Sequence, residues 1–286
     1  MEWLCLDFVE RVSQRLDLDG ARKLASLAKN TWQTQASERL ENVVSFKFHM
    51  ERYSKVTDGP AIFMEVTPPT FSLYSEGPVT IDKVCFSKMH NGPSDVNARP
   101  SDLVTAEAAV KLKKLFSKTR YPINSVIMHH GIYHILPDEH PEYETLYPRP
   151  IQFMDILRII KHIHTLTVHH WIEAAPLDRV IPKTMASIEM LDMLVPIDCQ
   201  NQILDALEDG RIMSLRISVF TQSLKFYDKL LLKVSSSNFA YDLSIDESAE
   251  PTAKRLKVPY KIVPNRSTIK LPFEWSLRRP IEYRFL

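Results

Sequence analysis

The sequence predicts an α/β fold, in which a small helical module at the N-terminus precedes an open sheet of alternating strands and helices. Apolar residues recur at helical spacing in the first part of the chain. Apolar and polar residues then alternate with period two from Val44 to Met50, as in a strand. From residue 126 onward, short apolar strands alternate with helical stretches. We therefore expect two domains, a helical module over residues 1–43 and an α/β domain over residues 44–286.

The helical module is predicted to begin with an amphipathic helix. Its apolar positions recur at helical spacing and are Leu4, Phe8, Val9, Val12 and Leu16. Asp17 and Asp19 can cap a second helix. Arg22 and Lys23 are then expected in its first turn, where the helix dipole disfavours positive charge.

A third short helix is expected from Gln33 to Asn42, with Ala36 and Leu40 facing inward. Three short helices that share one large aromatic residue, Trp32, barely close a hydrophobic core of their own. Apolar surface is therefore left over on this module, and we expect it to form a docking face.

The residues of this module resemble an F-box. The first half of the family pattern is matched by Leu4, Asp7, Phe8, Val9, Val12 and Leu16. The second half is matched by Leu24, Leu27, Lys29 and Trp32. Cys5 stands where the family has a proline, so the chain lacks the fixed φ angle that proline gives to the start of a helix.

The resemblance implies a divergent F-box protein, similar to the nematode members that carry a C-terminal strand–helix domain. Such a protein is a substrate-recognition adaptor of a cullin-RING (SCF-type) ubiquitin ligase. Its helices bind the adaptor subunit of the ligase, its C-terminal domain binds a target protein, and other subunits do the chemistry. The resemblance therefore implies no catalytic site, metal or cofactor in this chain. The expected partner-binding residues are Leu4, Leu6, Asp7, Phe8, Val9, Val12, Leu16, Leu24, Leu27 and Trp32.

The α/β domain is predicted to begin with strands and one long helix. Strands are expected over residues 44–50, 61–67, 71–75 and 80–88, and at the chain's end over 260–264, 268–272 and 281–286. The helix is expected from Asp102 to Ser117, with Ser101 as its cap and Lys111, Lys113, Lys114 and Lys118 on a solvated side or near its C-terminus.

The rest of the domain has a repeating pattern. Strand centres are expected at residues 126–128, 166–168, 191–193, 215–217 and 241–243, and helices at 153–160, 202–207 and 224–232. The last four strand centres lie about 25 residues apart, a period that resembles leucine-rich repeats. The asparagine that such repeats place after the strand is missing. The pattern therefore predicts a strand–helix solenoid or an open leucine-rich-repeat-like sheet.

Composition excludes several classes of partner and compartment. The 36 basic and 35 acidic residues nearly cancel, so no overall field favours nucleic acid or a membrane surface.

Cys5, Cys85 and Cys199 are far apart and form no disulfide framework, which indicates a reducing compartment. No secretory leader and no apolar run of about 18 residues is expected. We expect an intracellular protein, cytoplasmic or nuclear. The segment Pro251–Val258 resembles a short nuclear import signal, with a solvated loop as the alternative.

Two histidine pairs are the main candidates for chemistry. His129-His130 and His169-His170 each follow a strand centre by the same offset, so neighbouring strands would bring them to one sheet edge. Further candidate ligands lie just beyond, at His134, Asp138, Glu139 and His140. Consecutive histidines on a strand point to opposite faces, however, and the chain has no HExxH, GxSxG or GxGxxG motif. The alternatives to the adaptor are a metal-dependent enzyme and a non-catalytic repeat scaffold whose N-terminal helices form a cap.

Overall fold

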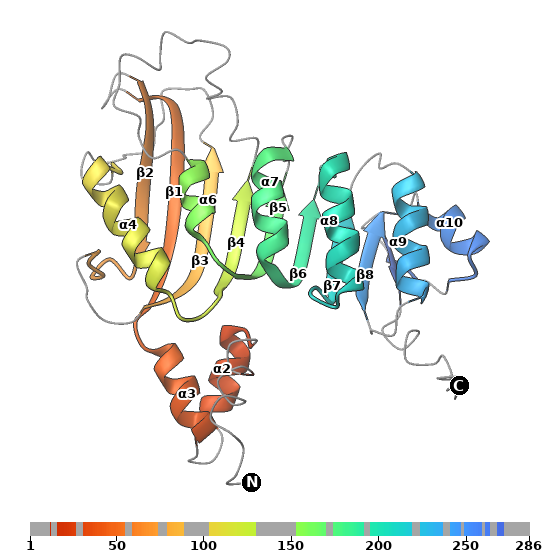
Figure 1. Cartoon of the computed structure of the whole chain (residues 1–286), viewed down its shortest axis with the longest axis horizontal. Coiled ribbons are helices and arrows are strands. Elements are labelled where there is room, and N and C mark those ends of the chain that lie inside the picture. Colours follow the sequence, from red (N-terminus) through yellow and green to blue (C-terminus); the bar gives the residue numbers. More distant parts are fainter. Residues whose placement is uncertain are drawn as a thin grey trace. The chain divides into compact units, whose positions relative to one another are not determined.

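The structure is a computed structural model, and its strands and helices alternate along the chain (Figure 1). The residues that it describes are 12, 16–26, 31–54, 59–73, 79–88, 103–129, 153–169, 174–191, 195–218, 224–236, 241–246, 249–258, 261–263 and 268–271. The chain forms two compact units, Met1–Leu166 and Thr167–Leu286. The N-terminal helices therefore belong to the same compact unit as the first four strands. The predicted α/β class is confirmed, because most strand pairs are parallel and helices connect them.

The first unit combines two N-terminal helices with a sheet in the order β2-β1-β3-β4-β5. Its elements are α2 (Leu18–Ala25), α3 (Thr31–Leu40), β1 (Val43–Ser54), β2 (Gly59–Thr67), β3 (Thr80–Lys88), α4 (Ala106–Lys118), β4 (Ile123–His129) and α6 (Phe153–Ile159). The division between the units falls within β5 (Ile163–His169). Strand β1 is antiparallel to β2 and parallel to β3, which is parallel to β4.

The strands of the first unit bury one face and leave the other partly open. Phe46 and Phe48 of β1 are buried, and the Phe48 ring stacks on Phe86 of β3 with centroids 5.3 Å apart. Phe116 of α4 covers them, with its ring centroid 5.5 Å from that of Phe46. Lys47, which alternates with these phenylalanines, is exposed. This alternation follows from the period of two in a strand.

The strands of the second unit also bury one face and leave the other partly exposed. Its elements are α7 (Ala174–Val180), η3 (Ile181–Lys183), β6 (Thr184–Leu191), α8 (Ile197–Glu208), β7 (Ser214–Ser218), α9 (Leu224–Ser236), β8 (Asp242–Asp246), α10 (Glu250–Arg255), β9 (Lys261–Val263) and β10 (Thr268–Leu271). The strand order is β6-β7-β8-β10-β9, with β6, β7 and β8 parallel and β10 antiparallel to both of its neighbours. Strands β9 and β10 confirm the strands predicted over 260–264 and 268–272, although β10 lies between β8 and β9 and only β9 is at the edge.

The buried face of the second unit is apolar and the opposite face is polar. The buried strand residues are Ile188, Met190, Leu215, Ile217, Leu243 and Ile245, and α8 and α9 add Cys199, Ile203, Leu207, Phe226 and Leu230. On the other face Glu189 and Arg216 are partners in the β6–β7 register and form an ion pair of 2.6 Å. Both are only partly buried, so this face is accessible at these positions. Strands β6, β7 and β8 lie side by side in chain order, whereas β10 lies between β8 and β9.

Several predicted boundaries are wrong for identifiable reasons. The strand expected around residues 191–193 is β6, which ends at Leu191, and the strands at Thr184, Ser214 and Asp242 are unevenly spaced. The regular period therefore came from a misplaced strand. The helix expected from Asp102 begins at Ala106 with Thr105 as its cap, because Val104 N–H donates to the Ile62 carbonyl at 2.8 Å and holds the preceding segment against β2.

Other differences are smaller. Residues 71–73 are not a strand, and the rest of that predicted strand lies outside the described residues, as does the segment 281–286. Arg22 and Lys23 lie in the last turn of α2 and not in its first, because the helix is only 8 residues long. There their charges suit the helix dipole. Among the described residues, no helix is long and apolar enough to cross a bilayer.

Candidate docking module

Helix α2 begins at a well-formed N-cap. Asp17 has an extended backbone, and its side chain accepts a hydrogen bond of 2.6 Å from the Gly20 N–H. This confirms Asp17 as the predicted cap. A Cβ atom on Gly20 would lie 2.9 Å from Asp17 Oδ1, so a larger residue there would require the cap side chain to shift. Asp19, in the first turn, forms an exposed ion pair of 2.5 Å with Arg22.

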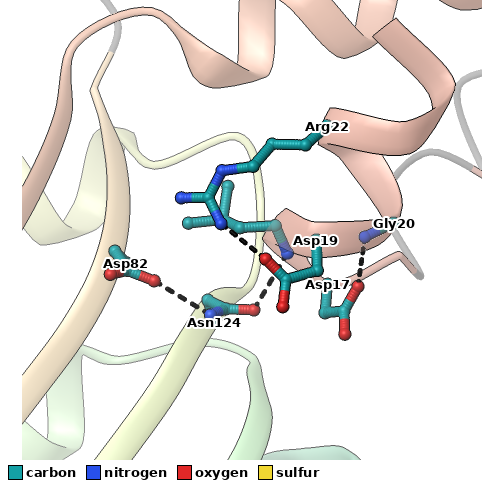
Figure 2. A network of polar contacts seen from close by, with 7 residues as sticks. Asp17, Asp19, Gly20, Arg22, Asp82 and Asn124 are labelled. Atoms are coloured by element: carbon teal, nitrogen blue, oxygen red, sulfur yellow. Dashed lines mark hydrogen bonds and ion pairs between the residues drawn. The ribbon is translucent and has the colours of Figure 1, made fainter. Parts of the chain in front are cut away.

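The start of α2 is attached to the sheet through one asparagine. The Leu18 N–H donates to Asn124 Oδ1 at 3.2 Å, and Asn124 Nδ2 donates to Asp82 Oδ1 at 2.9 Å. Figure 2 shows Asn124 lying between the first turn of α2 and Asp82. Asn124 and Asp82 lie near the amino ends of β4 and β3. The helix N-terminus therefore meets the amino edge of the sheet.

Helix α3 is anchored by a buried arginine. Arg39 is fully buried, and its guanidinium carbon lies 5.2 Å from the centre of the Tyr121 ring, just before β4. Burial lowers the pKa of Arg39, while Tyr121 and Asp17 act in the opposite direction. Arg120 lies 5.8 Å from the same ring and forms an ion pair of 3.7 Å with Glu38. Cation–π and ionic contacts thus tie α3 to the turn before β4.

The predicted partner-binding residues are described only in part. Val12, Leu16, Leu24 and Trp32 are half-buried, so each keeps part of its apolar surface accessible. The remaining six, Leu4, Leu6, Asp7, Phe8, Val9 and Leu27, lie outside the described residues, as does Cys5. The side chains of α2 and α3 that are fully enclosed are Leu18, Ala21, Ala36 and Arg39. The four described partner-binding candidates are therefore less buried than Leu18, Ala21, Ala36 and Arg39.

Sequence reasoning missed the residues that fix the module in place. Arg39 follows Ala36 by three positions and so shares the inward side of α3, where a charged residue signals a specific partner. Asn124 gave no such signal, because its partner Leu18 is 106 positions away.

The histidine candidates form no metal site in the described part of the chain. His129 and His169 are the last residues of β4 and β5 and are half-buried. No group of three or more described His, Cys, Asp or Glu side chains could hold a metal ion. His130, His134, Asp138, Glu139, His140 and His170 lie outside the described residues.

A different histidine, His49, joins three strands. Its Nε2 donates to Glu65 Oε1 at 3.2 Å, and its Nδ1 lies 2.8 Å from Ser87 Oγ. In the neutral ring, Nδ1 then accepts the hydroxyl proton of Ser87. Ser87 Oγ is also 3.4 Å from the Phe48 carbonyl, and Lys47 lies 3.5 Å from the other Glu65 oxygen. Because the Glu65 side chain is 53% exposed, these contacts make a solvated tie between strands.

The described cysteines are protonated thiols. Burial raises the pKa of Cys85 on β3. It raises the pKa of Cys199 in α8 to about 12, with help from Asp178 and Asp198. A thiol with a raised pKa supplies little thiolate at neutral pH, so neither residue is an activated nucleophile.

The basic cluster proposed as an import signal is folded and not an open loop. Lys254 and Arg255 end α10, and they form ion pairs with Glu250 at 2.9 Å and with Asp228 of α9 at 2.8 Å. Two of its charges are therefore engaged within the second unit.

The chain matches no known family model, and neither the curated proteins nor the solved structures contain a match to it. Its function is therefore inferred from its own residues and geometry.

Proposed function

We propose that this protein is a substrate-recognition adaptor of an SCF-type ubiquitin ligase, and that its N-terminal helices dock on the adaptor subunit of that ligase. The observation that carries the proposal is the half-burial of Leu24 and Trp32 on helices whose enclosed contacts are made by other residues. Leu24 and Trp32 are also two of the positions that match the F-box pattern.

The division of labour within α2 and α3 supports this proposal. Leu18, Ala21, Ala36 and Arg39 face inward, and Asn124 and Tyr121 hold the helices at the sheet edge. The half-buried apolar residues keep part of their surface accessible to a partner. Complete burial of an aliphatic or aromatic side chain contributes about 1.5–3 kcal/mol, so two or three such residues would account for a large part of a stable docking contact.

The sheet supports a target-binding role for the rest of the chain. In the second unit the open face presents Ser187, Glu189, Ser214, Arg216 and Ser244, all partly exposed. Such a polar, uncovered face can bind a protein target without chemistry in this chain.

The proposal is tested by capture of the purified adaptor subunit with the full chain. The double change Phe8→Ala and Val9→Ala should abolish capture, while the second unit keeps its unfolding transition. Val110→Ala is the matched control, because Val110 is an apolar residue of α4 that is 68% exposed and lies outside the module. Equal capture by wild type and the double variant would reject the adaptor function.

A helical cap on a repeat scaffold is the second candidate, and the Leu18–Asn124 and Arg39–Tyr121 contacts favour it. A cap needs no partner, so deletion of residues 1–42 should destabilise the first unit and the intact chain should not capture the adaptor. Specific capture by the intact chain would eliminate this candidate.

A further inference from the structure

A set of exposed basic side chains lies beside the N-terminal helices. They come from the C-terminal part of α4, from the turn before β4, and from α6 and the turn before β5. This basic rim consists of Lys113, Lys114, Lys118, Arg120, Arg158 and Lys161, and all six are exposed.

Contacts between neighbouring segments bring the rim together. Lys161 Nζ donates to the Ser117 carbonyl at 3.0 Å, which joins the turn before β5 to the end of α4. The Ile123 N–H donates to the His162 carbonyl at 3.0 Å, which joins that turn to the start of β4. Arg120 then reaches Glu38 of α3 at 3.7 Å. The rim is therefore continuous with the proposed docking module.

The sequence around the lysines of the rim is poor in acidic residues. Residues 108–137 and 156–172 contain no Asp or Glu. Lys113, Lys114 and Lys118 form no ion pair with any carboxylate of the described residues.

Helix stability does not explain this arrangement. Lys114 and Lys118 are four positions apart on α4, a spacing at which like charges repel. The helix dipole favours Lys118 in the last turn, but its effect falls off before Lys113 and Lys114. The lysines of the rim are therefore explained by solvation or by a partner, and not by the stability of α4.

The surroundings of the rim fit an acidic protein surface better than a nucleic acid. Nucleic-acid surfaces combine basic residues with exposed aromatic rings on which bases stack. Tyr121, the aromatic ring next to Arg120, is buried. The net charge of the chain is only +1, so attraction is local to the rim and does not act over the whole molecule.

We propose that the basic rim binds an acidic protein surface and, given the proposed function, that this surface belongs to the ligase adaptor bound by α2 and α3. The helices would provide apolar contact, and the rim would accelerate association and fix its orientation, as complementary charges do at protein interfaces.

The test uses a charge-reversal variant of the full chain, Lys113→Glu, Lys114→Glu and Lys118→Glu. The matched control is Lys225→Glu, Lys229→Glu and Lys257→Glu, which makes the same charge change at exposed positions of the second unit. Thermal unfolding checks that both variants fold. A labelled polyglutamate peptide and the purified adaptor are then titrated at about 50 and 300 mM salt, which spans strong to weak screening.

Wild type should bind polyglutamate at low salt, and the rim variant should lose about tenfold or more in affinity while the control loses about twofold or less. For the adaptor, the rim variant should associate about tenfold more slowly than the control at low salt, and the difference should shrink at high salt. Equal behaviour of the two variants, or tighter binding of duplex DNA than of polyglutamate through the same lysines, would overturn the rim proposal. Binding of polyglutamate through the rim without any binding of the adaptor would instead overturn the proposed function.

Discussion

Helices α2 and α3 are attached to their sheet in a different way from helices α8 and α9. The N-terminal pair meets the amino edge of β3 and β4 through polar groups, namely Asn124, Asp82 and the buried Arg39. Helices α8 and α9 lie on a sheet face through fully buried apolar side chains such as Ile203 and Leu230.

The two kinds of attachment have different physical consequences. Apolar burial is non-directional and scales with area, so it stabilises the strand–helix layer strongly and tolerates small shifts. Hydrogen bonds and buried charges contribute less net free energy, but they require one geometry. Beside the apolar burial of Leu18, Ala21 and Ala36, polar contacts therefore hold the N-terminal helices at a defined orientation, which suits a module that presents residues to a partner.

The largest effect should come from the apolar layer. Leu215→Ala removes a fully buried side chain of β7 and should reduce the free energy of unfolding by about 2–5 kcal/mol. Urea unfolding measures the loss, with the exposed Val110→Ala as a control that should change it by less than about 0.5 kcal/mol. A loss below about 1 kcal/mol for Leu215→Ala would contradict the apolar account of this layer.

Arg39→Ala should give the next largest effect. It removes the stacking on Tyr121 and leaves a cavity, and we expect a loss of about 1–3 kcal/mol. Hydrogen exchange should accelerate in α2 and α3 and stay unchanged in α8 and α9. Arg39→Met keeps most of the volume without the charge, so it should lose less. If both variants leave exchange in α3 unchanged, Arg39 is not its anchor.

Asn124→Ala should have a somewhat smaller effect. It leaves the partly buried Leu18 N–H and the Asp82 carboxylate without this partner, at a cost of about 1–2 kcal/mol. The measurement is exchange of the Leu18 amide, which should become faster while the amides of β7 do not. Protection of that amide in the variant would show that the asparagine does not make the attachment.

Asp17→Ala should lower stability by about 1 kcal/mol, because the Gly20 N–H loses its cap. Asp17→Asn keeps an acceptor and should recover most of the loss in thermal unfolding. A variant with alanine that unfolds like wild type would mean that the cap is not needed for α2.

The second unit has its own polar tie, which makes a small, pH-dependent contribution. The hydrogen bond from Thr252 lowers the pKa of Asp228, and Arg255 adds to the effect. The stabilisation from the Asp228 carboxylate should be complete above the carboxyl pKa in the unfolded chain, which is about 3.9. It should be lost as the pH falls through the lower pKa of this group in the folded protein. Asp228→Asn should flatten this part of the acid unfolding curve relative to wild type. If wild type and Asp228→Asn have identical acid unfolding curves, Asp228 makes no pH-dependent contribution to stability.

Local features of the fold were predictable from the sequence where neighbouring residues decide them. The predicted strand 80–88 coincides with β3, and Asp17 is the cap of α2, because alternation and capping depend on adjacent positions. Strand β6 was misplaced, since its apolar stretch continues past Leu191 and only pairing of Ile188 and Met190 with β7 fixes its limits.

The residues of the candidate site also fall into two groups, those that the sequence predicts and those that only the structure reveals. The pattern of Leu24 and Trp32 could be recognised in the sequence, and the structure leaves both half-buried. Neither Asn124 nor the continuity of the basic rim with α3 could be recognised, because each depends on segments brought together from distant parts of the chain.

The sequence by itself determined the α/β class, the helical start, the apolar sides of most strands and the lysines of α4, because all of these follow from the period of a helix or strand. Only the tertiary structure decided that the helices meet the amino edge of the sheet, that Arg39 is buried there and that the basic side chains gather beside it. The physical reason is that a polar contact stabilises the fold only when its atoms have the right distance and angle. Packing between segments that are far apart in the sequence sets both.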